Sequence, residues 1–164
     1  MKRAQIDAFC GCRETLYQRI VFFAAPAILL AGIVYVAVRY AQLPAEIPSH
    51  YNFYGEIDGY GSRGTLWIMP AVGILCDALM LAVSFFPQTW NVGTSVTVFN
   101  RALVYRRVRD LIADMRLSTA VMFTAIAVWQ TALAPTFPWG MGVLIGVCCT
   151  APLVRFFVRL AMKK

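Results

Sequence analysis

The sequence predicts an all-α integral membrane protein with four transmembrane helices, both termini in the cytoplasm and an ordered outer loop between the first two helices. Sixty percent of the 164 residues are hydrophobic and only 14% are charged, which leaves too little polar surface for a soluble domain. A helix crosses the hydrocarbon core with about 20 apolar residues. Four runs are near that length, so we treat residues 1–164 as a single membrane domain. The predicted spans are about 20–38, 66–86, 117–133 and 137–154.

The distribution of basic residues predicts the orientation. Thirteen of the fifteen Lys and Arg residues lie before the first run, between the second and third, or after the fourth. Only Arg39 and Arg63 lie in the other two loops. Lys and Arg are retained on the cytoplasmic side of membrane segments. This orientation and attraction to anionic lipid account for the net charge of +7, so the lipid bilayer is the expected partner and nucleic acid is not.

The first and last runs each have an alternative interpretation. The first has 19 residues, which exceeds the apolar core of about 7–15 residues in a secretory signal, so we predict an anchor helix. The fourth has Pro138 and Pro152 near its ends, and residues 117–154 also fit a re-entrant hairpin. Cationic residues flank this pair on both sides, which favours two full spans with the connecting turn outside.

The outer loop, residues 43–64, has the composition of a compact, ordered segment. Pro44 and Pro48 restrict the backbone, and Gly55 and Gly61 permit tight turns. Four polar side chains that fall within nine residues are His50, Asn52, Glu56 and Asp58. These types can bind a divalent cation, but their spacing matches no known ligand pattern, and turn capping explains them more simply. We therefore predict no metal and no cofactor.

One acidic residue, Asp77, lies inside the second run. Insertion of Asp at the centre of a membrane helix costs roughly 2.5–3.5 kcal/mol, and such residues are often functional. The expected partners on other helices are Thr124, Gln130, Thr131 and Arg155. Two interpretations stay open, a structural polar contact and a proton or substrate role. In the structural interpretation, replacement of Asp77 by Leu costs little.

The segment before the third span predicts a basic amphipathic helix. Asn100 is a candidate N-cap, and the helix continues through Arg116 into the third span. Val104, Val108 and Leu111 lie on one apolar stripe. Arginines on other faces are Arg101, Arg106, Arg107 and Arg109. This pattern predicts a helix that lies on the cytoplasmic membrane surface; a docking site for a cytoplasmic protein is the alternative.

The outer loop carries a motif of Pro, His-x-Asn, Gly-x-x-Asp, an aromatic-Gly pair and a basic residue. The motif positions are Pro44, Pro48, His50, Asn52, Gly55, Asp58, Tyr60, Gly61 and Arg63. This pattern resembles a bacterial membrane domain of uncharacterised function that forms the first half of SdpI-type immunity proteins. The resemblance covers about residues 20–133 and implies a multi-pass protein of the bacterial cytoplasmic (inner) membrane. Fuller family members have a second membrane half linked to toxin immunity and repressor sequestration, where this chain has one further span.

Two classes of function follow from these patterns. The first is a non-enzymatic sensor or SdpI-like immunity or signalling protein, whose outer loop meets an extracellular peptide or envelope component and whose basic loop contacts a cytoplasmic protein. The second is a small oligomeric transporter or a membrane enzyme that uses Asp77 or the His50 cluster. The sequence has no nucleophile–base pair and no nucleotide-binding loop, so we expect no catalytic residues. Small residues at Gly142, Gly146 and Thr150 are compatible with a homo-oligomer.

The predicted orientation is tested by labelling of single cysteines in intact cells. Cysteines introduced at Ser62 and Thr136 should react with a membrane-impermeant reagent, and cysteines at Thr94 and Lys164 should not. External labelling at Thr94 would show that the orientation inferred from charge is inverted.

Overall fold

The computed structural model describes residues 2–92 and 95–162. Two of the labelling positions above, Thr94 and Lys164, lie outside these residues. The described chain is mostly helical, and four of its helices are long and apolar enough to cross a membrane, which confirms the predicted fold class. The membrane-length helical segments are Leu16–Tyr40, Arg63–Ser84, Arg101–Gln130 and Trp139–Ala161.

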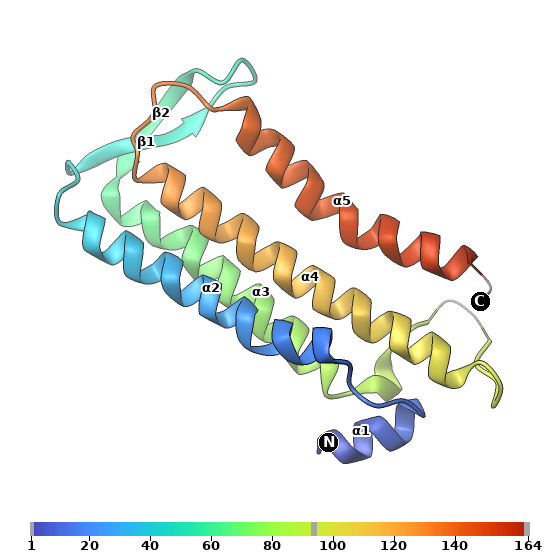
Figure 1. The fold of residues 1–164 in the computed structure, drawn as a ribbon. Coiled ribbons are helices and arrows are strands. Elements are labelled where there is room, and N and C mark those ends of the chain that lie inside the picture. Colours follow the sequence, from blue (N-terminus) through green and yellow to red (C-terminus); the bar gives the residue numbers. More distant parts are fainter. Residues whose placement is uncertain (1, 93–94, 163–164) are drawn as a thin grey trace.

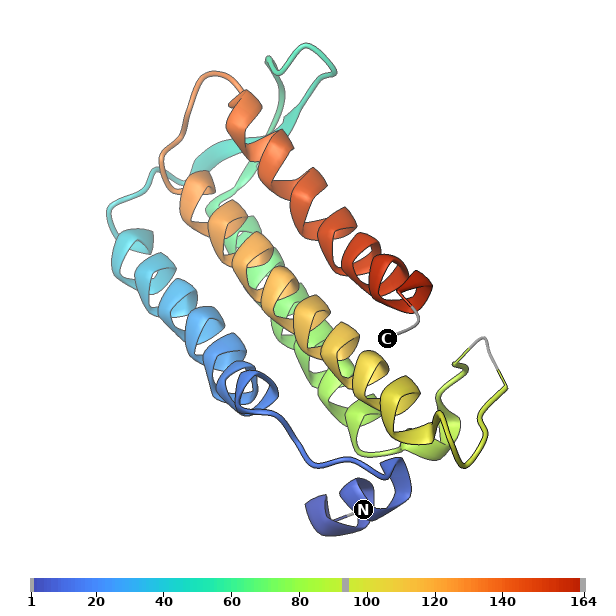
Figure 2. The ribbon, with the colours of Figure 1, turned by 45° about the vertical axis from the view of Figure 1, so that its right-hand side comes forward.

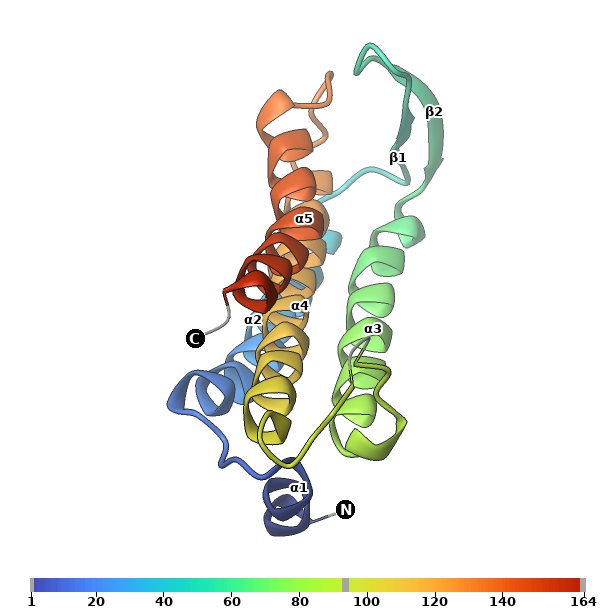
Figure 3. The same cartoon turned by 90° about the vertical axis from the view of Figure 1, so that its right-hand side faces the viewer.

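The four long helices form a bundle in which α4 occupies the central position. Helices α2, α3 and α5 all pack against α4, whereas α2 and α3 contact each other much less (Figure 3). Their bounds are α2 Leu16–Tyr40, α3 Ile68–Ser84, α4 Arg101–Gln130 and α5 Trp139–Ala161, and α3 is preceded by the 3-10 helix η1, Arg63–Trp67. Both termini lie at the same end of the bundle, which we call the basic end, and the opposite end is the hairpin end (Figures 1 and 2).

At the hairpin end, a two-stranded antiparallel sheet joins α2 to α3 (Figure 1). Its strands are β1, Glu46–Tyr51, and β2, Ile57–Ser62. The sequence predicted an ordered loop here but not strands. Ile47 of β1 is fully buried against Val36 and Leu66. This packing on the bundle outweighs the low strand propensity of the two glycines in β2.

The prediction for the basic amphipathic helix is wrong in one respect. Helix α4 continues without a break for 30 residues, about 45 Å along its axis, because the sequence between Arg101 and Gln130 contains neither Gly nor Pro. This segment therefore extends along the bundle axis and does not lie on the membrane surface. Its Tyr105 packs with Ile6 and Cys10 of the short helix α1, Arg3–Cys10.

Small residues set the distance between the helices. Ala25 of α2 and Ala120 of α4 are fully buried in the contact between these helices. A Cβ atom on Gly32 would lie 2.8 Å from Cγ2 of Thr124. Oγ1 and Cβ of Thr124 would lie 3.1 and 3.3 Å from the same added atom, so rotation of the Thr124 side chain does not relieve the contact. The approach of α2 to α4 thus depends on the missing side chain at Gly32.

Substitution of this glycine tests the packing. Gly32→Ala should destabilise the protein by about 1–3 kcal/mol, because overpacking forces the helices apart. Gly146→Ala is the matched control on α5, where an added Cβ has no atom within 4 Å. Thermal unfolding in detergent is the measurement, and equal melting temperatures for the two variants would contradict the observed contact.

Candidate functional site

The hairpin is docked on the turn between α4 and α5. The Tyr51 hydroxyl donates a hydrogen bond to the carbonyl oxygen of Ala134 at 2.9 Å, and the Tyr51 ring lies 5.1 Å from that of Trp129. The Phe137 N–H donates to the Gly55 carbonyl oxygen at 2.7 Å. Burial raises the pKa of the Tyr51 hydroxyl, because the phenolate would lose its hydration. The motif loop is thereby fixed to a turn about 80 residues further along the chain.

Asn52 closes the turn of the hairpin. Its amide oxygen accepts hydrogen bonds from the backbone N–H groups of Tyr54 and Glu56, each at 2.9 Å. Its amide nitrogen donates to the Glu56 carboxylate at 3.1 Å. Gly55 has a φ of +81°, and a Cβ there would lie 3.3 Å from the carbonyl oxygen of Phe137. Turn geometry and close docking therefore explain two motif residues.

Arg63 ties the end of the hairpin to its beginning. Its backbone N–H donates to the carbonyl oxygen of Ala45 at 2.9 Å. Its guanidinium donates to the carbonyl oxygen of Leu43 at 3.2 Å and lies 4.9 Å from the centroid of the Tyr40 ring. A basic residue at this position thus holds both strands close to the end of α2.

The other motif residues lie along the two strands. In the strand register, Ile47 is opposite Gly61 and Pro48 is opposite Tyr60. Pro44 precedes β1 and is exposed, as is Tyr60, whereas Pro48 is half-buried. Tyr60 is therefore a motif residue whose ring stays available on the surface.

The candidate metal ligands of the loop do not converge. His50 Nδ1 lies 2.5 Å from Oδ1 of Asp58, and both side chains are exposed. The Glu56 carboxylate accepts a hydrogen bond from Asn52 instead. Within residues 2–92 and 95–162, no group of three or more His, Cys, Asp and Glu side chains is placed to hold a metal ion. The arrangement therefore provides a local hydrogen-bonded pair.

Inside the bundle, Asp77 of α3 forms a two-point ion pair with Arg116 of α4. The Nε–Oδ1 and Nη2–Oδ2 distances are 2.7 and 3.0 Å. Both residues are buried, with 6% and 4% of their surface exposed. The two parallel bonds give the fork geometry in which guanidinium and carboxylate groups interact most strongly. Asp77 precedes the end of α3 by seven residues, about 10 Å along the axis.

The partners expected for Asp77 from the sequence bond elsewhere or have no partner. Thr124 donates to a backbone carbonyl of α2, and Thr131 donates to one within α4. Arg155 pairs with an aspartate of α4. The Gln130 amide oxygen is buried without a hydrogen-bond partner among the described residues. Sequence analysis assigned Arg116 to the cytoplasmic segment and so missed it as the partner.

Two acidic residues near the basic end, Asp110 and Asp114 of α4, were also missed. Each carboxylate joins α4 to both α2 and α5. The partners are Arg159 and Gln18 for Asp110, and Arg155 and Tyr17 for Asp114. The sequence contains a signal for these ion pairs. Two acidic residues lie four apart on one helix, and two arginines lie four apart on the next helix, so each acid can meet one arginine.

The four arginines predicted to form a basic surface have different environments. Arg109 donates to a carboxylate of α1 at 2.8 Å, and Arg101 lies 5.1 Å from an aromatic ring of α1. Arg107 donates to a backbone carbonyl at the end of α5 at 2.8 Å. Arg106 is exposed. Three of the four therefore hold α1 or α5 in place.

Comparison with known proteins covers part of this architecture. Residues 27–74 match the family described as Domain of unknown function (DUF1648). This range contains most of α2, the hairpin and the first turns of α3. The chain is also similar to an uncharacterized protein of Archaeoglobus fulgidus, with 26% identity over 145 residues and 79% of each chain covered. No solved structure matches the chain. The chain is thus a multi-pass membrane protein with a domain of unknown function.

The buried ion pair changes the expected effect of replacing Asp77. Asp77→Leu leaves Arg116 buried without its partner, and removal of one member of such a pair costs about 3–5 kcal/mol. The double variant Asp77→Leu, Arg116→Leu removes both charges and should recover most of the lost stability. Thermal unfolding in detergent measures both. A double variant less stable than Asp77→Leu alone would show that the pair is not the stabilising unit.

Proposed function

We propose that this protein is a non-enzymatic membrane sensor of the immunity or signalling type. Its hairpin end binds an extracellular peptide or envelope component, and its basic end transmits this binding to a cytoplasmic protein. The observation that carries the proposal is that one unbroken helix, α4, contacts both ends. Trp129 of α4 contacts Tyr51 of the hairpin, and Arg109 contacts Asp7 of α1.

Exposed aromatic residues support the receiving role of the hairpin end. Phe53 and Tyr54 at the tip of the hairpin are 100% and 85% exposed, and Trp139 at the start of α5 is 92% exposed. Aromatic side chains are enriched at protein interfaces because they bury a large area at little entropic cost. Asn52, Gly55 and Arg63 of the motif are committed to hydrogen bonds with backbone groups of the hairpin and its neighbours. The exposed aromatic rim is therefore the part that meets a ligand.

The resemblance of the loop motif to SdpI-type immunity proteins supports the same class of function. It also favours a location in the cytoplasmic membrane of a bacterium. Helix α5 offers a surface for a homo-oligomer, since its Gly140 and Gly146 have open space where a side chain would be. Small residues of this kind let a second helix approach closely.

A second candidate function is a small oligomeric transporter or membrane enzyme. The buried Asp77–Arg116 pair favours it, because ionisable residues inside membrane spans often mark ion or proton pathways. In this alternative the essential events take place within the bundle, and the docking of the hairpin has only a structural role.

The thiol of Cys10 reports on the state of the basic end. Cys10 is fully buried in the contact between α1 and α4, and burial raises its pKa to about 11. It therefore reacts with alkylating reagents near neutral pH only when α1 moves away from α4.

Tyr51→Ala should increase the alkylation rate of Cys10 severalfold, because it removes the contact between the hairpin and α4. Tyr60→Ala, a control on the exposed face of the same hairpin, should not. Peptide-resolved mass spectrometry of alkylated membranes gives the rate, and the melting temperature of each variant reports general unfolding. Unchanged Cys10 reactivity in Tyr51→Ala, with proteolysis showing a released hairpin, would favour the transporter alternative.

A further inference from the structure

The segment that leads into α4 presents exposed apolar side chains. Phe99 is 100% exposed and Leu103 is 40% exposed. The Thr97 N–H donates to the Asn100 side-chain oxygen at 2.7 Å, and the Asn100 N–H donates to the Thr97 hydroxyl at 3.3 Å. The Arg101 N–H donates to the Thr97 carbonyl oxygen at 3.0 Å, as in a helix. A helical turn thus precedes α4, and Phe99 and Leu103 lie one turn apart on the same face.

This turn lies beyond the expected cytoplasmic boundary of the membrane. Arg159 of α5 is bonded to Asp110 of α4 and is the twenty-first residue of α5 counted from Trp139. About 20 helical residues cross the hydrocarbon core, so Asp110 lies near its edge. Phe99 precedes Asp110 by eleven residues, about 16 Å along the axis, whereas the headgroup region is only about 5–8 Å deep. Phe99 therefore faces water, beyond the end of α5 (Figure 2).

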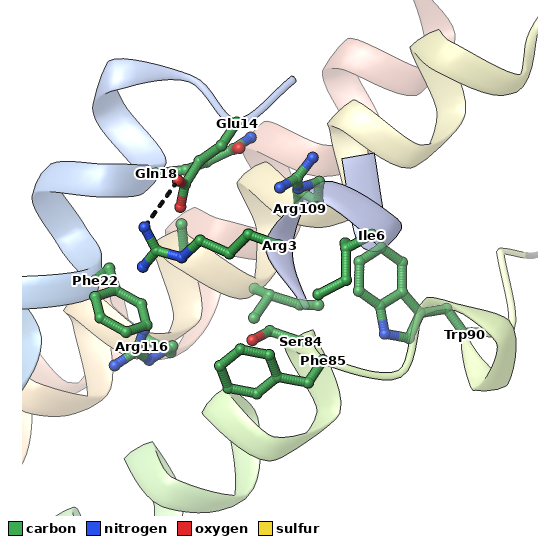
Figure 4. Close-up of a pocket in the computed structure, with 12 residues that line it drawn as sticks. Arg3, Ile6, Glu14, Gln18, Phe22, Ser84, Phe85, Trp90, Arg109 and Arg116 are labelled. Carbon is green, nitrogen blue, oxygen red and sulfur yellow. Dashed lines mark hydrogen bonds and ion pairs between the residues drawn. The ribbon is translucent and has the colours of Figure 1, made fainter. Parts of the chain in front are cut away.

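The arginines that follow on this part of α4 carry uncompensated charge. Arg106 is exposed, and Arg107 donates to two backbone carbonyls at the end of α5. Neither forms an ion pair with the residues that the structure describes. The acidic residues nearby are bonded to other arginines, as Glu14 is to Arg3 (Figure 4). The remaining pairs are Asp7 with Arg109, Asp77 with Arg116, Asp110 with Arg159 and Asp114 with Arg155.

A groove between α4 and the end of α5 brings the apolar and basic side chains together. Its volume is about 220 Å³, and its lining residues are Leu103, Arg106, Arg107, Asp110, Arg159 and Met162. Asp110 and Arg159 neutralise each other, so the other two arginines leave the groove positively charged. Phe99 lies one turn beyond Leu103 at its outer end. We call the surface formed by Phe99, Leu103, Arg106 and Arg107 the tip face.

We propose that the tip face binds an acidic amphipathic helix of a cytoplasmic protein. Phe99 and Leu103 contact the apolar side chains of that helix, and Arg106 and Arg107 attract its carboxylates. Amphipathic helices bind in this way to exposed apolar grooves, and complementary charge selects the partner. A lipid headgroup would supply the negative charge but would not cover Phe99 at this distance from the membrane. The inference rests on the sensor function proposed above and gives the surface and the chemistry of its cytoplasmic partner.

The test uses the purified full chain in nanodiscs of phosphatidylcholine and three fluorescent model peptides. A helical peptide with Leu on one face and Glu on the other should bind in a saturable manner. A peptide with Lys in place of Glu, and one with Ser in place of Leu, should each bind about tenfold more weakly or less. Fluorescence anisotropy gives the affinities, and empty nanodiscs give the background. Equal affinity for the Glu and Lys peptides, or no saturable binding of the Leu/Glu peptide, would overturn the proposal.

Two pairs of variants identify the surface. Phe99→Ser should weaken binding of the Leu/Glu peptide about tenfold, because an aromatic contact is lost. Phe53→Ser is the matched control, since Phe53 is also 100% exposed but lies at the hairpin end. Arg106→Gln should weaken binding severalfold, and Arg13→Gln, which removes an exposed arginine of the basic end outside the tip face, should not. These side chains are exposed, so the melting temperature should not change. Equal affinities within either pair would contradict the assignment.

A membrane lipid as the occupant gives a different result. Phe99→Trp adds a fluorophore to the tip face, and brominated phosphatidylglycerol in the nanodisc should not quench the emission that it adds to the wild-type signal. Quenching of this added emission would show that lipid covers the tip face and would overturn the proposal.

The outcome is separable from that of the Cys10 experiment. Binding of the Leu/Glu peptide to the tip face, with unchanged Cys10 reactivity in Tyr51→Ala, would retain the docking surface and reject the transmission between the two ends. The opposite pair of results would retain the sensor function and reject the tip face as its docking surface.

Discussion

Three charged side chains of α4, those of Asp110, Asp114 and Arg116, lie within the bundle because neighbouring helices supply a partner for each. Arg116 is bonded at two points to Asp77 of α3, and Asp110 and Asp114 are bonded by arginines of α5. A buried charge without a partner costs several kcal/mol in a medium of low dielectric constant. Because the partners come from different helices, the same requirement determines which helices are neighbours and in what register they pack.

The two ends of the bundle are held by different interactions. Towards the basic end, ion pairs fix the register of α4 against α3 and α5. Further along, close packing dominates, as at Gly73, where an added Cβ would lie 2.9 Å from Leu29 and 3.0 Å from Phe123. Without water to drive apolar groups together, membrane helices rely on such close contact and on polar bonds.

The sequence predicted the features that depend on local properties of the chain. Run length and hydropathy indicated the four spans, and the positions of Lys and Arg placed both termini at one end. The partner of Asp77 could not be predicted, because it depends on the rotation of α4 and on its continuation past Arg116. The strands were missed for a similar reason. Gly59 and Gly61 disfavour a strand locally, and the burial of Ile47 against the bundle outweighs that preference.

The residues of the outer-loop motif could be identified from the sequence, but their contacts are visible only in the structure. Residues such as His50, Glu56 and Asp58 are typical metal ligands, and spacing alone does not distinguish ligation from turn formation. In the structure, the Glu56 carboxylate accepts a hydrogen bond from Asn52 within the turn and is not grouped with the other two side chains. The backbone geometry of the loop thus decides which acidic side chain is available for other contacts.

Helix α5 is a second element that connects the two ends of the molecule. Its extensive contacts are with α4, so it can shift with less loss of packing than α2 or α3. At the hairpin end, the segment that leads into α5 is bonded to Gly55 through Phe137. At the basic end, Arg155 and Arg159 of α5 are bonded to carboxylates of α4. Packed interfaces change between discrete arrangements. A displacement at Phe137 therefore has to be accommodated either within the helix or at these ion pairs.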